Sequence, residues 1–147
     1  AGAPGLVGGQ VVDLECEGKE VDLETLEYIH LHKTGALLKA CVRTGAMIAG
    51  ANEELLKALT TYAEGIGLAF QIVDDILDLT SSSEKLGKTA GKDLLADKTT
   101  YPKLLGMEES KKRAFDLVGK AKKAIEPWGL NAKYLISLAD FITSRDR

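Results

Sequence analysis

Several features that define other protein classes are scarce or missing in this sequence. Its two cysteines, Cys16 and Cys41, are too few for a disulfide framework and lack metal-ligand spacing, so reduced, buried thiols are expected. No apolar run approaches the length of a membrane span, and no signal peptide is visible, which favours the cytoplasm, or a plastid if the source is a plant. The formal net charge of −3 predicts no nucleic-acid partner. What remains is a globular chain.

Helical periodicity dominates what is present. The 147 residues, 45% of them hydrophobic, suffice for one domain or part of one. Because there is no internal repeat and no series of short alternating strands, an all-α fold is predicted. Residues 1–18 fit a glycine-broken strand or one helical stripe equally well. Helices are expected over residues 22–50, 52–79, 108–125 and 131–142, with a further helix starting at 99–102.

The ends and faces of these helices can also be predicted. Asp22, Asn52 and Asn131 are the expected N-caps, because their short polar side chains can accept a hydrogen bond from the first turn. The run from Thr80 to Ser83 is expected to end the second helix. In the last helix, apolar periodicity predicts an inner stripe of Tyr134, Leu135, Leu138, Phe141 and Ile142.

The helix over residues 52–79 contains two glycines, Gly65 and Gly67. Each costs about 1 kcal/mol relative to alanine in a helix interior. Two such costs require a reason, such as close approach by another helix or room for a ligand.

Three carboxylates interrupt the apolar body of this helix near its end. Asp74 and Asp78 are four residues apart and project from one face, while Asp75 lies about a quarter turn round. Carboxylates this close repel one another unless a cation neutralises them. Mg²⁺ takes one or two carboxylates and completes its octahedral shell with water and phosphate oxygens. The stretch therefore indicates a magnesium site. A solvated acidic helix edge is the alternative, which this pattern alone would favour.

A polar, glycine-broken connection follows the acids over residues 84–98. Its lysines stand next to the aspartates in sequence, which suggests a polyanion held between metal and ammonium groups. Glycines allow such a loop to close over a ligand, and a purely solvated loop is the alternative. The lysines are Lys85, Lys88, Lys92 and Lys98.

A second basic position lies in the helix over residues 22–50. Lys33 stands beside Thr34 and Gly35 in an increasingly apolar stretch, and taken alone it is interpreted as a surface lysine with a packed stem. His30 and His32 are two residues apart and point to different sides of a helix. They are interpreted as surface or core histidines rather than ligands.

Together these motifs resemble the C-terminal half of a trans-isoprenyl diphosphate synthase, the family that includes farnesyl and geranylgeranyl diphosphate synthases. Five motifs occur in that family's order and at its approximate spacing, across essentially the whole chain. They are Gly9-Gln10-x-x-Asp13, His32-Lys33-Thr34, Gly67-x-Ala69-Phe70-Gln71-x-x-Asp74-Asp75-x-x-Asp78, Gly87-Lys88-x-x-Gly91-Lys92-Asp93 and Lys98-Thr99-Thr100-Tyr101-Pro102.

The resemblance implies a helical bundle of the isoprenoid synthase type, a Mg²⁺ cofactor, and condensation of an allylic diphosphate with isopentenyl diphosphate. In the metal site it implies Asp74 and Asp78 as ligands, with Asp75 linked through water or supporting them from behind. Tyr101 and Pro102 are assigned to the scaffold. For the substrates, the resemblance implies that Lys33, Lys88 and Lys98 contact the allylic diphosphate. It implies that Thr34 and Gln71 stabilise the cation that develops at C1 of the allylic substrate. It also implies that Phe70 borders the hydrocarbon cavity.

The sequence departs from the family by lacking the half that carries the first aspartate-rich motif. Residues 1–147 are therefore interpreted as the C-terminal half of one domain, inactive alone. It is either a fragment, which Ala1 in place of methionine favours, or a chain completed by a partner; a homodimer is the family's expected assembly. Two alternatives stay open: a non-catalytic or completing subunit of a heteromeric synthase, and a related Mg²⁺-dependent terpene cyclase.

Overall fold

The computed structural model describes residues 2–85 and 98–145, and the regular structure in these two ranges is entirely helical. The all-α prediction is confirmed, and the undecided N-terminal stretch is helical. In chain order the elements are η1 (Ala3–Val7), α1 (Gly8–Glu15), α2 (Leu23–His30), η2 (Leu31–Gly35), α3 (Ala36–Ile48), α4 (Glu53–Lys85), α6 (Tyr101–Leu105), α7 (Met107–Ile125), η3 (Glu126–Ala132) and α8 (Lys133–Ser144). The turns η1 and η2 are π-helical, and η3 is a 3₁₀ helix.

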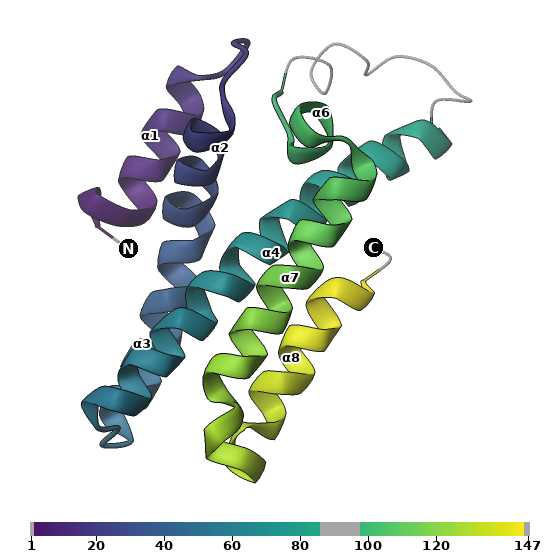
Figure 1. Cartoon of the computed structure of the whole chain (residues 1–147). Coiled ribbons are helices and arrows are strands. Elements are labelled where there is room, and N and C mark those ends of the chain that lie inside the picture. The colour runs from purple at the N-terminus through teal and green to yellow at the C-terminus, as the bar shows by residue number, and fades with distance from the viewer. Residues whose placement is uncertain (1, 86–97, 146–147) are drawn as a thin grey trace.

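Helix α4 is the axis of the bundle. It contacts α3, η2, α6, α7 and α8, and Figure 1 shows it between α3 and α7, with α8 lying beyond α7. Its central turns are deeply buried, and Tyr62, Ala69 and Ile72 expose no surface. The largest contact is with α7, whose buried residues recur at three- and four-residue spacing as expected for one helix face. These residues are Ser110, Ala114, Val118, Ala121 and Ile125.

Both glycines of α4 lie where another helix approaches closely. A Cβ at Gly67 would lie 2.9 Å from the Cα of Gly35, and one at Gly65 would lie 3.1 Å from the Cβ of Ala121. Side chains at these positions would force the helices apart, so the predicted reason for the glycines holds. The Gly67 contact also presses η2 against α4 one turn before Gln71.

Two of the predicted N-caps are confirmed. The Thr25 N–H donates to Asp22 Oδ1 at 2.9 Å, and the Leu55 N–H donates to Asn52 Oδ1 at 2.8 Å. Hydrogen bonding from Thr25 also holds the pKa of Asp22 below its ordinary value. The helix predicted over residues 22–50 differs in one respect, because the π-turn η2 widens it at the residues of the His-Lys-Thr motif. Such turns are rare in helices and are found frequently at functional sites.

The prediction that Thr80 to Ser83 ends the helix is wrong, because α4 continues to Lys85. Thr80 Oγ1 donates to the Ile76 carbonyl at 3.0 Å and lies 3.1 Å from the Leu77 carbonyl. A threonine that satisfies its hydroxyl on the preceding turn leaves the helical backbone bonds in place.

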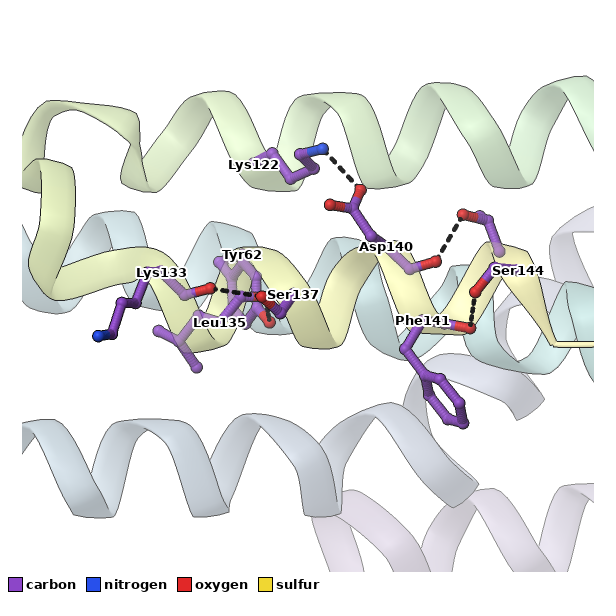
Figure 2. Close-up of polar contacts among 9 residues, drawn as sticks. Tyr62, Lys122, Lys133, Leu135, Ser137, Asp140, Phe141 and Ser144 are labelled. Atoms are coloured by element: carbon purple, nitrogen blue, oxygen red, sulfur yellow. Dashed lines mark hydrogen bonds and ion pairs between the residues drawn. The ribbon is translucent and has the colours of Figure 1, made fainter.

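Helix α8 begins one residue later than Asn131 predicts. Its N-cap is Ala132, without a side-chain bond, because η3 already carries Asn131 inside a helical turn. Figure 2 shows how α8 is anchored: the Tyr62 hydroxyl donates to the Leu135 carbonyl at 2.6 Å. Burial raises the pKa of Tyr62 to about 12, so this hydroxyl stays protonated and remains a donor at neutral pH.

The predicted inner stripe of α8 is wrong in part. The prediction holds for Ile142, which is buried, and for Leu135, which is half-buried, whereas Tyr134, Leu138 and Phe141 are 76%, 46% and 60% exposed. Ala139, which the prediction did not include, is also buried. Figure 2 shows the Phe141 ring pointing away from α7. Two parallel stripes with the same helical spacing compete here, and the small Ala139 lets its own stripe approach the core more closely.

Within the two described ranges, no helix combines the length and hydropathy needed to cross a bilayer.

Candidate functional site

The three aspartates of α4 lie in three different environments. Asp75 is buried, with 6% of its surface exposed, Asp74 is half-buried, and Asp78 is exposed. Because α4 is helical throughout this stretch, Asp74 and Asp78 lie one turn apart on the same face. Asp75 faces a different set of neighbours, so the acidic motif is divided between the core and an open face.

Asp75 belongs to what we call the buried polar cluster, in which His30, Asp75 and Tyr101 are buried and Glu27 and Arg113 at its edge are half-buried. Its Oδ2 accepts a hydrogen bond from the Tyr101 backbone N–H at 3.0 Å and lies 3.1 Å from His30 Nε2. The His30 and Tyr101 rings stack with centroids 5.6 Å apart.

The buried polar cluster extends to a further ion pair. The Tyr101 hydroxyl donates to Glu27 Oε1 at 3.1 Å, and Arg113 pairs with the same carboxylate. Burial, followed by the nearby Glu27 charge, raises the pKa of the Tyr101 phenol, so it remains a donor. These bonds tie α2, α4, α6 and α7 together around Asp75.

Asp74 belongs to an open cluster made of Phe70, Gln71, Asp74 and Arg145. Its Oδ1 lies 2.5 Å from Arg145 Nη2, and its Oδ2 accepts from Gln71 Nε2 at 3.2 Å. The Arg145 guanidinium carbon lies 4.2 Å from the centroid of the Phe70 ring, within cation–π range. Asp74 is therefore already paired with a cationic side chain.

The structure places Lys33 and Thr34 in the π-turn η2, both half-buried. Lys33 Nζ lies 2.6 Å from Asp13 Oδ2 of α1. Helix α1 reaches this turn because Gly9 lets it approach closely; a Cβ there would lie 2.3 Å from the Lys33 backbone nitrogen. The Gly9-Gln10-x-x-Asp13 motif thus supplies both the close approach and the counter-ion for Lys33.

The structure describes only some of the lysines that follow the aspartates in sequence. Lys98 is exposed and lies three residues before Tyr101, whose backbone is bound to Asp75. Lys88 lies outside the described residues, as do Lys92 and Asp93. The geometry thus brings together Phe70, Gln71 and Asp74, and leaves the contribution of the lysine loop as an expectation.

The open face fits Mg²⁺ better than metals that need a preformed protein cage. In the described part of the chain, no three His, Cys, Asp or Glu side chains converge as a metal-binding group. Mg²⁺ does not need three, because it keeps several waters and uses one or two carboxylates plus phosphate oxygens. Asp74 and Asp78 provide such oxygens, and Asp74 already attracts a cation. Asp75 is less suited, since its Oδ2 is bound to two partners in the core.

Two residues at the site were not identified from the sequence. His30 was interpreted only as a surface or core histidine, yet it contacts Asp75. Arg145 was not assigned a role, yet it contacts Asp74 and Phe70. The one usable signal was a histidine next to Ile29 on the apolar side of α2, which must find a polar partner if buried.

The fold and the open cluster define a helical protein with a half-exposed acidic helix face that fits a magnesium ion. The sequence profile of the family described as Polyprenyl synthetase matches residues 3–127, so the chain belongs to that family. A dimethylallyltranstransferase from Fischerella ambigua is 56% identical over 145 residues, which cover 98% of this chain and 42% of that protein. The chain therefore spans less than half the length of this curated relative.

Solved structures give the same result. An FPP/GFPP synthase from Zymomonas mobilis is 36% identical with a TM-score of 0.79, over 96% of this chain and 46% of that one. A geranyltransferase from Helicobacter pylori, solved with magnesium and isoprenyl diphosphate, is 31% identical with a TM-score of 0.74, over 96% and 46%. The predicted family and fold are confirmed.

Proposed function

We propose that residues 1–147 form the C-terminal half of a trans-prenyl diphosphate synthase domain that elongates an allylic diphosphate with isopentenyl diphosphate, to a product of the farnesyl or geranylgeranyl class. The observation that carries the proposal is the open cluster, in which Asp74 lies half-exposed on α4 beside Gln71 and Phe70. Family membership and the magnesium–isoprenyl diphosphate complex of the Helicobacter pylori relative support it.

In this proposal the difficult step is heterolysis of the allylic C–O bond, in which pyrophosphate leaves with the electron pair. The alkene of isopentenyl diphosphate then forms the new C–C bond, and loss of a proton completes the step. Asp74 and Asp78 would hold Mg²⁺, which when bound supplies positive charge for the departing pyrophosphate. Asp75 would not contact the metal; its bonds to His30 and the Tyr101 N–H would fix the position of α4, which carries Asp74 and Asp78.

The other proposed site residues act on the two ends of the breaking bond. Lys33, Lys88 and Lys98 would donate to the diphosphate oxygens, and the Asp13 carboxylate keeps the Lys33 ammonium directed before substrate binds. The carbonyl oxygen of Gln71 and the hydroxyl of Thr34 would face the cation that develops at C1. Phe70 would border the prenyl chain, where an aromatic face tolerates both hydrocarbon and nearby cationic charge.

The chain needs a second half for this activity, because it spans 42% of its Fischerella relative. That half would come from the same polypeptide, with the complete domain forming a homodimer. The alternative is a separate partner chain, in which case this protein is the completing subunit of a heteromeric synthase.

A chimera tests the proposal. The part of the Fischerella ambigua relative that precedes its match would be joined to Ala1, and elongation of labelled geranyl diphosphate would be followed with and without Mg²⁺. We expect Mg²⁺-dependent elongation by the chimera and none by the 147-residue chain alone.

Three outcomes would contradict this expectation. A folded but inactive chimera would remove the proposed function. A cyclic hydrocarbon formed from the allylic substrate alone would indicate a terpene cyclase. Elongation by the isolated chain would show that no second half is needed. The Asp74→Asn chimera serves as the control for activity that depends on this chain.

A further inference from the structure

Arg145 is held at the open cluster from outside its helix. Helix α8 ends at Ser144, and Arg145 has extended backbone angles of φ −65° and ψ 139°. Its side chain is nevertheless only 13% exposed, because it folds back between Asp74 and the Phe70 ring. The guanidinium has left solvent to reach one carboxylate oxygen of the proposed metal site.

This position conflicts with metal binding. Asp74 Oδ1 is bound to Arg145 and Oδ2 to the Gln71 amide, so both oxygens have donors. A divalent cation on Asp74 would meet a guanidinium within a few ångströms, and like charges at such distances strongly disfavour one another. Guanidinium and metal therefore compete for the same carboxylate.

The contact between Arg145 and Asp74 can also be broken at a small free-energy cost. Because Arg145 lies beyond the last residue of α8, its displacement need not unwind the helix. Its buried Nε has no hydrogen-bond partner in the described structure, so leaving costs no bond at that atom. The main losses are the ion pair and the Phe70 contact, and a metal ion would replace the first.

We propose that Arg145 is the resident counter-ion of Asp74 and is exchanged for the divalent cation when metal binds. Arg145 is thus a positioning residue: it orients Asp74 when no metal is bound and couples metal occupancy to the C-terminal turn of α8. This inference rests on the proposed function, since it takes Asp74 as a metal ligand.

Metal affinity gives the first test. Binding of Mn²⁺, an EPR-visible ion with similar preference for oxygen ligands, would be measured on the full 147-residue chain and on the chimera. We expect Arg145→Gln to bind the ion on the order of tenfold more tightly than wild type, by analogy with the effect of a neighbouring charge on a carboxylate. Lys133→Gln is the matched control and should leave affinity unchanged: it removes one positive charge at the far end of α8, about 18 Å away at 1.5 Å per residue.

Hydrogen exchange gives the second test, which separates exchange of partners from simple charge repulsion. In the wild type, Mn²⁺ should speed amide exchange in residues 141–145 and slow it in residues 71–78 of α4. In Arg145→Gln the first change should be absent, because the end of α8 is already released.

The outcomes are distinguishable. Equal Mn²⁺ affinity in wild type and Arg145→Gln, with binding lost in Asp74→Asn, would overturn the exchange and leave the proposed function standing. The proposal would also be overturned if Arg145→Gln binds Mn²⁺ more tightly but Mn²⁺ does not speed amide exchange in residues 141–145 of the wild type. Charge repulsion between Arg145 and the metal would then explain the affinity without any exchange of partners. If Asp74→Asn binds as wild type does, or no variant binds, the metal site itself is wrong and both proposals fail.

Discussion

Asp74 and Asp75 are neighbours in sequence, but the buried polar cluster and the open cluster use them in opposite ways. Asp75 is 6% exposed and bound to His30 and the Tyr101 backbone, whereas Asp74 is half-exposed and paired with the Arg145 guanidinium. In the core, a carboxylate whose hydrogen bonds are satisfied joins helices and resists change. On the open face, an identical group stays partly exposed to solvent although both of its oxygens have donors. A single step of 100° along α4 separates the two roles.

The largest expected effect is on the open side. In the active chimera, Asp74→Ala should lower kcat by at least about 10³-fold, as expected when a group that stabilises developing charge through a metal is removed. The free energy of unfolding should change little, because Asp74 is not part of the core. Steady-state kinetics and urea unfolding of the same variant measure the two quantities. If Asp74→Ala instead lost much stability and little kcat, then Asp74 would have the structural role assigned here to Asp75.

The next largest effect concerns the lysines that follow α4. If they contact the pyrophosphate, Lys88→Ala and Lys98→Ala should each cost roughly 2–4 kcal/mol in the activation free energy, mainly in kcat. Lys85→Ala is the control, since Lys85 lies outside the family motif and should be nearly silent. Mg²⁺-dependent kinetics of the three chimeras decide the matter. Equal, small effects would leave the aspartates as the only groups acting on the diphosphate.

The smallest effect is on the buried side and is one of stability. Removing His30 or Asp75 leaves a buried polar partner without its bond, which costs about 1–3 kcal/mol. We expect His30→Ala and Asp75→Ala to lower the free energy of unfolding by this amount, measured by urea denaturation of the chimera. Asp75→Asn should recover part of the loss, because its amide oxygen can still accept from the Tyr101 N–H. If these variants bind Mn²⁺ as weakly as Asp74→Asn, then Asp75 acts at the metal and the division fails.

Local patterns were sufficient for part of this structure. The course of α4 up to Leu79, the shared face of Asp74 and Asp78, and the caps at Asp22 and Asn52 follow from helical spacing and short-range hydrogen bonds. The close approach at Gly67 could be inferred because a glycine within a buried helix is otherwise unfavourable.

Other features depend on contacts that sequence spacing does not contain. His30 meets Asp75 across 45 residues, and Arg145 meets Asp74 across 71. In α8, Tyr134, Leu138 and Phe141 have the same helical spacing as the neighbouring stripe of Leu135, Ala139 and Ile142. The predicted stripe combined members of both, because periodicity could not choose between them. Only tertiary packing makes these choices.

The hydrogen bond from Tyr62 to the Leu135 carbonyl fixes the position of α8 along its own axis relative to α4. From that fixed point, ten residues lead to Arg145, a length of about 15 Å at 1.5 Å per residue. One inserted residue would move the guanidinium about 1.5 Å along the axis and swing it 100° around it, away from Asp74 and Phe70. The contact of Arg145 with Asp74 therefore depends on the number of residues that separate Arg145 from the anchored Leu135 carbonyl. We expect an insertion or deletion in α8 to disturb this contact more than a substitution that keeps the length of the helix.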